Sequence, residues 1–203
     1  MAQRKGFKDV YVAEVDYNPL TDTYTAKKPV MLFNAKSGKT KIKYEISDEY
    51  ADDKLISRDK EFQNGEIEIE GINITPEKLE LIYGHKVVEG MSITREDDPV
   101  KYVAVGFRSK NADKTYHFYW YYLVNFSGDE ELDFETIAEK SKKQTIKLKG
   151  EILARPDGHI GVDIDESVLT GSNTKAKALL AIDDTDHIIK WFTAVPEPLT
   201  PTI

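Results

Sequence analysis

The chain has 203 residues and a formal net charge of −8, with 36 acidic and 28 basic residues. It contains no cysteine, which excludes disulfides, thiolate nucleophiles and cysteine-based zinc sites. An acidic chain is poorly suited to hold nucleic acid by its phosphates, and no apolar run approaches the roughly 20 residues that span a membrane. Hydrophobic residues make up 40% of the sequence, enough for one sizeable core, so we expect a single domain over residues 1–203.

The N-terminal part of the sequence predicts an arm, a strand and a loop. Residues 1–30 combine a short apolar alternation with a turn at 16–19, which indicates an extended N-terminal arm containing a little strand. Charged and apolar residues alternate over 39–46, as in a strand with one face in water. Residues 47–64 are polar and lack this period, which predicts an unusually long inter-strand loop, and such loops tend to be functional or disordered.

A half-buried strand and a short helix are predicted next. Residues 65–71 read Gly-Glu-Ile-Glu-Ile-Glu-Gly, which places glutamates on one face of a strand and isoleucines on the other. In the segment after it, Thr75 suits the N-cap, Pro76 the first helical position and Gly84 the end of a helix. The apolar side of this helix is expected to pack against one side of a sheet.

The C-terminal half predicts more strands and an extended end. Strands are expected over 100–107 and 115–126, joined as a hairpin, and over 142–153. A small helix is possible over 175–181, and the prolines near the end predict an extended C-terminal arm over 186–203. Many strands and one clear helix predict a mainly β fold, a sandwich or barrel, with one short packed helix, a long loop and two arms.

Motifs that carry chemistry are weak in this sequence. Residues 33–40 end in Gly-Lys-Thr like a phosphate-binding loop, but a strand pattern follows where a helix is required. The acidic cluster at 183–187 lacks the glycine and distal glutamate of a calcium loop, so a solvated acidic turn is the preferred interpretation. We therefore expect no enzyme, no catalytic residues, no metal site and no cofactor.

Two surface features leave alternatives open. Lysines are dense up to Lys43 and acidic residues dominate after Gly150, which fits either an ordinary solvated surface or two complementary poles that stack head to tail. The aromatic run at 116–122 fits either core packing or a platform for a sugar. The second choice, with Tyr119 and Tyr121 exposed, predicts a monomeric carbohydrate-binding or adhesin-like β-sandwich module.

Taken in order, these motifs resemble the major tail protein, or tail tube protein, of long-tailed siphophages of Gram-positive bacteria. The similarity runs from about Val10 to Val195 and rests on the succession of segments rather than on any one of them. The segments that carry it are Tyr-Ala-Asp-Asp at 50–53, the Glu/Ile strand at 65–69, the helix at 76–84, the strands at 102–107 and 116–126, Gln-Thr-Ile-Lys-Leu-Lys-Gly at 144–150, and Trp-Phe-Thr-Ala-Val at 191–195.

This resemblance implies a structural virion protein that self-assembles into hexameric rings stacked as a tube for genome delivery. Its partners would be further copies of itself, the tape measure protein and the tail-tip and tail-terminator proteins. Double-stranded DNA would pass through without specific binding, and no membrane would be involved. The protein would be assembled in the host bacterial cytoplasm and end in the tail of the virion.

Three groups of residues receive roles under this resemblance. The long loop would contact a neighbouring subunit, and the C-terminal arm would do the same. Glutamates on the Glu/Ile strand would face the lumen, since lysines there would hold back DNA; they could instead line an outer wall or pair across strands with Lys41, Lys43, Lys147 and Lys149. These groups are Tyr50, Asp52, Asp53, Lys54 and Arg58 in the loop, Trp191, Phe192 and Val195 in the arm, and Glu66, Glu68 and Glu70 on the strand.

Overall fold

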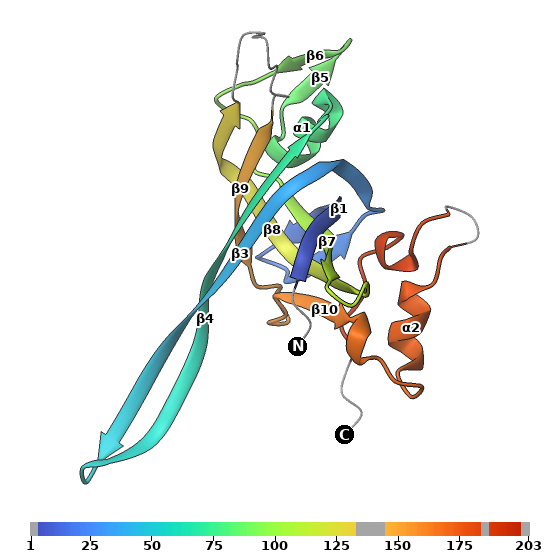
Figure 1. The fold of residues 1–203 in the computed structure, drawn as a ribbon. Coiled ribbons are helices and arrows are strands. Elements are labelled where there is room, and N and C mark those ends of the chain that lie inside the picture. Colours follow the sequence, from blue (N-terminus) through green and yellow to red (C-terminus); the bar gives the residue numbers. More distant parts are fainter. Residues whose placement is uncertain (1–3, 133–144, 184–186, 200–203) are drawn as a thin grey trace, which may run out of the picture.

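The computed structural model describes residues 4–132, 145–183 and 187–199 (Figure 1). Most of these residues lie in antiparallel strands, so the predicted mainly β fold is confirmed. The strands are β1 (Arg4–Asn18), β2 (Thr23–Ala26), β3 (Val30–Ala51), β4 (Lys54–Ile72), β5 (Lys86–Val88), β6 (Met91–Ile93), β7 (Tyr102–Asn111), β8 (Tyr116–Leu132), β9 (Ile146–Leu153) and β10 (Gly161–Asp165). The helices are α1 (Pro76–Tyr83), α2 (Thr174–Leu180) and the short 3₁₀ turns η1 (Glu166–Val168) and η2 (Lys190–Phe192).

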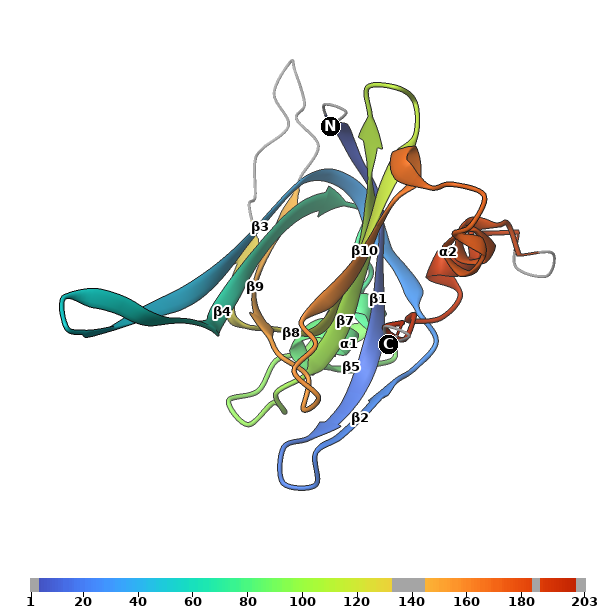
Figure 2. The same cartoon turned by 90° about the horizontal axis from the view of Figure 1, so that it is seen from below.

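Six strands close into a barrel. In the order β8, β7, β1, β3, β4 and β9, each strand pairs with the next, and β9 pairs again with β8. The closure is possible because β8 is long enough to serve two partners. Its first part, His117–Tyr121, pairs with β10, whereas its later part, from Leu123 on, pairs with β9. Figure 2 shows the ring of strands from below.

The core has two layers, one on each side of the barrel wall. Side chains from β1, β4, β7, β8 and β9 fill the interior together with the apolar side of α1. A second cluster covers the outer face of β1, β7 and β8, and the C-terminal segment packs onto it. These three strands are therefore apolar on both faces, as the run at 116–122 predicts for a covered strand.

The predicted N-terminal arm is wrong for the residues that the structure describes. From Arg4 onward, the chain forms β1, which lies inside the sheet between β7 and β3. Val10 and Val12 point into the barrel, and Ala13 and Val15 point into the outer cluster, all of them buried. The short alternation was therefore part of a central strand that must be apolar on both faces. Residues 1–3 lie outside the described residues.

The predicted long loop over 47–64 is also wrong in conformation. These residues belong to β3 and β4, which continue past the barrel as a two-stranded ribbon and turn at Asp52 and Asp53 (Figure 1). Both turn residues have positive φ, 49° and 61°, as a two-residue type I′ hairpin turn requires. The apolar–polar period is absent because both faces of the ribbon are exposed, so the usual signal of a strand is missing.

The predicted helix at 75–84 is confirmed as α1. Thr75 precedes it in an extended conformation, Pro76 starts it, and Gly84 ends it with φ 81° in the left-handed region. Ile82 and Tyr83 are buried against the interior cluster. The expectation of one packed helix needs a correction, because α2 forms at the possible second position and packs beside η2, with Leu179 and Leu180 against the outer cluster.

Candidate functional site

The ribbon projects past the barrel, and the rest of the described chain leaves both of its faces uncovered. One row of side chains that points into the barrel along β3 continues outward past Ile42 as Tyr44, Ile46, Asp48 and Tyr50. Outside the barrel no second layer covers these side chains, and the exposed fractions of Ile46 and Tyr50 are 59% and 63%. The apolar residues exposed on the ribbon are Tyr44, Ile46, Tyr50, Leu55 and Ile56.

Cross-strand contacts hold this ribbon in shape. Arg58 donates from Nε and Nη2 to the two carboxylate oxygens of Asp48 at 2.7 and 2.8 Å, a fork that fits one carboxylate. The same hydrogen bonds lower the pKa of Asp48. The ammonium group of Lys60 lies 3.7 Å from the centre of the Tyr44 ring. Of the predicted inter-subunit residues, Arg58 therefore has a partner inside the chain, whereas Tyr50 projects from the ribbon.

The opposite face of the ribbon is acidic. Glu45 lies directly across from Glu61, and Ser47 lies across from Asp59. Like charges placed opposite one another destabilise an isolated strand pair. Within the described part of the chain, no salt bridge relieves Glu45, Glu49 or Glu61. This face gains stability only when something positive lies against it.

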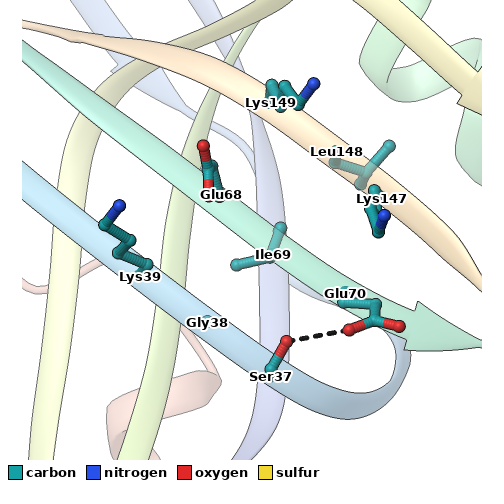
Figure 3. A pocket seen from close by; sticks show the side chains of 9 residues that line it. All are labelled: Ser37, Gly38, Lys39, Glu68, Ile69, Glu70, Lys147, Leu148 and Lys149. Carbon is teal, nitrogen blue, oxygen red and sulfur yellow. Dashed lines mark hydrogen bonds between the residues drawn. The ribbon is translucent and has the colours of Figure 1, made fainter.

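The three predicted lumen residues lie on the outer face of the barrel wall, on the strand that buries Ile67 and Ile69 on its inner side. In Figure 3, Lys39, Glu68 and Lys149 form one row across β3, β4 and β9, and Ser37, Glu70 and Lys147 form the next. Between the rows lies a hollow of about 310 Å³.

Two of the three glutamates, Glu66 and Glu70, have lysine partners. Glu66 forms an ion pair with Lys43, and Glu70 accepts hydrogen bonds from Lys36 at 2.7 Å and from Ser37 at 3.0 Å. Hydrogen bonding to these lysines lowers the pKa of both carboxyls. The sequence offered two alternatives to a lumen role, an outer wall and cross-strand pairing with lysine. The ion pair between Glu66 and Lys43 is an instance of the second. Whether this face also lines a lumen stays a prediction.

The predicted C-terminal arm is wrong for its described part, which is packed onto the barrel. Trp191 is fully buried and Phe192 is 2% exposed, and Val195 packs against the same outer cluster. The indole N–H of Trp120 donates to the carbonyl of Trp191 at 2.9 Å, and the Phe192 ring stacks on Tyr11 with centroids 4.5 Å apart. Trp191 and Phe192 are therefore core residues of this chain. Positions 186 and 200–203 of the predicted arm lie outside the described residues.

A half-buried arginine fixes the end of this segment. The Arg155 guanidinium lies between the rings of Tyr24 and Tyr122, 4.3 and 4.9 Å from their centres. It also forms ion pairs of 3.0 Å with Asp157 and with Glu197. The Tyr122 hydroxyl donates to the carbonyl of Pro196 at 2.9 Å, so the chain beyond η2 is tied to β8. Burial raises the pKa of both tyrosines well above the usual value of 10.0.

We expect alkaline pH to unfold the protein through these two tyrosines. Unfolded tyrosine loses its proton near pH 10, whereas the folded state keeps the proton to higher pH, so the unfolded state binds fewer protons in between. The free energy of unfolding should therefore fall above pH 10 by about 1.4 kcal/mol per pH unit for each tyrosine. Urea unfolding at pH 9, 10 and 11 measures this slope. Tyr24→Phe should make this fall with pH less steep, whereas Tyr50→Phe, which changes an exposed tyrosine, should not. If both variants showed the same slope, the buried Tyr24 would not be a source of the pH dependence.

Two sequence alternatives find little support in the geometry. Tyr119 and Tyr121, the residues of the possible sugar platform, are half-buried and pack on the interior cluster, where the Tyr119 ring stacks on Phe107 at 5.0 Å. Residues 33–40 lie within β3, so no helix follows the Gly-Lys-Thr sequence. The acidic cluster at 183–187 falls partly on residues 184–186, which lie outside the described residues.

Comparison with known proteins does not assign the chain to a family. No protein-family model matches the sequence, and no curated protein matches it either. In the part of the chain that the structure describes, no helix is long and apolar enough to cross a membrane. Fold and surface geometry therefore carry the functional argument.

Proposed function

We propose that this protein is a structural subunit that assembles with copies of itself into a hollow tube, as in the tail tube of a siphophage. The observation that carries the proposal is the β3–β4 ribbon, which projects from a closed barrel with an uncovered apolar face (Figures 1 and 2). The order of motifs that resembles the tail tube family gives the proposal its particular form.

The physical case rests on what a ribbon of this kind costs a monomer. A two-stranded ribbon is marginally stable in water by itself, because each strand has a partner on only one side. Here it also exposes Ile46 and Tyr50 on one face and opposed carboxylates on the other. Contact with another subunit covers the apolar side chains and supplies counter-charges. The ribbon is thus better suited to an assembly than to a solitary module.

The remaining roles follow from the proposed tube. Stacked rings, hexameric by resemblance, would form a conduit for double-stranded DNA, closed at its ends by tail-tip and terminator proteins and filled by a tape measure protein. Glu66, Glu68 and Glu70 remain our candidates for the lumen. A wall of paired lysines and glutamates binds phosphate less than lysine alone, which suits passage of DNA without specific binding. The proposed site of action is the virion tail, after assembly in the host cytoplasm.

The test is negative-stain electron microscopy of the purified protein at rising concentration. We expect rings or hollow tubes, whose number grows with concentration because each new subunit repeats the same contact. Isolated particles at every concentration, with and without a tail-tip extract as initiator, would contradict the proposal.

A second experiment, on phage instead of purified protein, tests the lumen assignment. In phage that carry Glu66, Glu68 and Glu70 all changed to lysine, tubes should still form but DNA release should slow. The matched variant changes Asp22, Glu89 and Glu96, exposed acidic residues outside the ribbon and this face, to lysine and should release DNA normally. Normal DNA release from the lysine variant would show that these three glutamates do not line the lumen.

A further inference from the structure

The outer edge of β3 is open over a long, regular stretch. Past Phe33, β3 pairs only with β4, so its other edge forms no strand ladder in the described part of the chain; close to the barrel the Phe7 ring of β1 reaches Gly38, and farther out the edge is clear. Two register shifts along the ribbon insert their extra residue into β4, at Gln63 and Ile56. From Ser37 to Ala51, β3 therefore alternates between its two faces without interruption. An open edge of this kind is a template for another strand.

The charges along this edge divide into a basic and an acidic half. The odd-numbered residues from 39 to 49 share one face of β3, because side chains alternate with period 2. Nearest the barrel they are Lys39, Lys41 and Lys43, and farther out they are Glu45, Ser47 and Glu49. The sequence of charges thus reverses about its midpoint, Tyr44.

We propose that a second copy of this chain pairs with the first along this edge, antiparallel, with the two-fold axis at Tyr44. In this register Lys43 lies opposite Glu45 of the second copy, and Lys39 lies opposite its Glu49. The two-fold axis repeats both pairs, giving four oppositely charged cross-strand pairs. Lys41 lies opposite Ser47, and the turn at Asp52 and Asp53 reaches the level of Lys36 in the other copy.

The other face of the paired strands is apolar around the axis. Tyr44 meets its own symmetry mate, and Ile42 lies opposite Ile46 of the second copy. The product is a four-stranded ribbon, in which each β3 has partners on both sides. This supplies the neighbouring strand that the isolated ribbon lacks, and it brings positive charge beside Glu45 and Glu49, which have no salt bridge among the residues that the structure describes.

Neighbouring registers are disfavoured by the same charges. With the axis one residue nearer the barrel, Lys43 faces Lys43 of the second copy. With the axis one residue farther out, Glu45 faces Glu45. Only the register centred on Tyr44 places two lysines of each chain opposite glutamates without opposing like charges. The charges therefore favour one register of pairing. Charges that only protected the edge from other strands would not have to favour any register.

This inference goes beyond the proposed function and does not depend on it. A two-fold pair is closed, whereas a tube needs a contact that repeats along its axis. The two-fold dimer is thus a form of the protein outside the tube. It covers the edge of β3 and must separate before the ribbon can contact other subunits of a tube. Its test uses the unassembled protein in solution, so the two proposals fail on different observations.

Single cysteines test the register, because the natural chain has none. In the Tyr44→Cys variant the two thiols lie opposite one another, within the Cα distance of about 7 Å that a disulfide tolerates. In the Ser47→Cys variant the thiols lie six residues apart along the strands, about 20 Å. Under mild oxidation, non-reducing gels should show about tenfold more covalent dimer for Tyr44→Cys.

A mixture of variants makes the test sharper. Lys41→Cys and Ser47→Cys should each form little disulfide alone, but an equal mixture should form the mixed disulfide, because residues 41 and 47 face one another across the axis. Equal dimer yields for Tyr44→Cys and Ser47→Cys, or a mixture that behaves like its components, would overturn the proposal.

Charge reversal tests the proposed pairs in the Tyr44→Cys background. Glu45→Lys places lysine opposite Lys43 on both sides of the axis and should lower the dimer yield about tenfold. Adding Lys43→Glu restores opposite charges and should restore the yield. Glu96→Lys, the same charge change at an exposed residue outside the ribbon, is the matched control and should leave the yield unchanged. Loss of dimer in the control, or no recovery in the double variant, would contradict the paired register.

Discussion

Replacing Trp191 with alanine is expected to lower the free energy of unfolding by about 3–5 kcal/mol, the usual cost of removing a buried tryptophan side chain. The side chain is fully buried in the outer cluster, against Phe118. Its removal leaves a cavity between the C-terminal segment and the wall of the barrel. Urea or thermal unfolding measures the change.

Two further variants make this prediction specific. The Trp191 indole nitrogen is buried and forms no hydrogen bond within the described part of the chain, so Trp191→Phe loses no polar contact and should cost much less than alanine. Leu199→Ala changes an exposed residue of the same segment and should shift stability by less than about 0.5 kcal/mol. If Trp191→Ala unfolded like Leu199→Ala, the segment would not be part of the core.

Shortening the ribbon is expected to abolish tube formation and leave the barrel folded. Tyr44 and Phe62 are directly paired, so residues 45–61 can be replaced by an Asn-Gly turn without changing the strands inside the barrel. The deletion removes the uncovered apolar side chains beyond Tyr44 and all of the acidic face, and it leaves the two core clusters intact.

The measurements are electron microscopy for tubes and circular dichroism for the fold. We expect an unchanged β spectrum, a melting temperature close to that of the natural chain, and no rings or tubes at any concentration. Tubes of normal appearance from the shortened chain would show that the ribbon has no part in assembly. A chain that fails to fold would contradict the description of the ribbon as separate from the core.

Sequence reasoning works in this protein where an element has one buried face. The strand at 65–71 shows its alternation because Ile67 and Ile69 point into the barrel and the glutamates point outward. The helix at 75–84 carries its signals in Thr75, Pro76 and Gly84, all of which act locally.

It fails where tertiary contacts override the local pattern. β1 is apolar on both faces, so its short alternation resembled that of a loosely structured arm. The ribbon has no buried face at all, and an Asp-Asp turn is a weaker hairpin signal than Asp-Gly. The prolines near the C-terminus correctly exclude a central strand, but they say nothing about Trp191 packing onto the barrel.

The same limits apply to the candidate site. The family resemblance singled out the tip of the ribbon and the row of glutamates. The tip is exposed, as are Glu66 and Glu68, whereas Glu70 is half-buried. The charge reversal about Tyr44 could have been found in the sequence. It predicts a pairing register only once residues 37–51 are known to form one uninterrupted strand with an open edge.

The closure of the barrel also decides when the chain can fold during synthesis. Strand β1 emerges first, but its main partner is β7, and the pairing of Arg4 with Asn111 joins residues more than a hundred positions apart. The ring closes only when β9 has paired with both β4 and β8, and the outer cluster waits for Trp191. Contacts so distant along the chain slow folding, because loop closure must precede them. Until β7 has left the ribosome, β1 lacks its main partner, and an open strand edge of this kind exposes a nascent chain to aggregation.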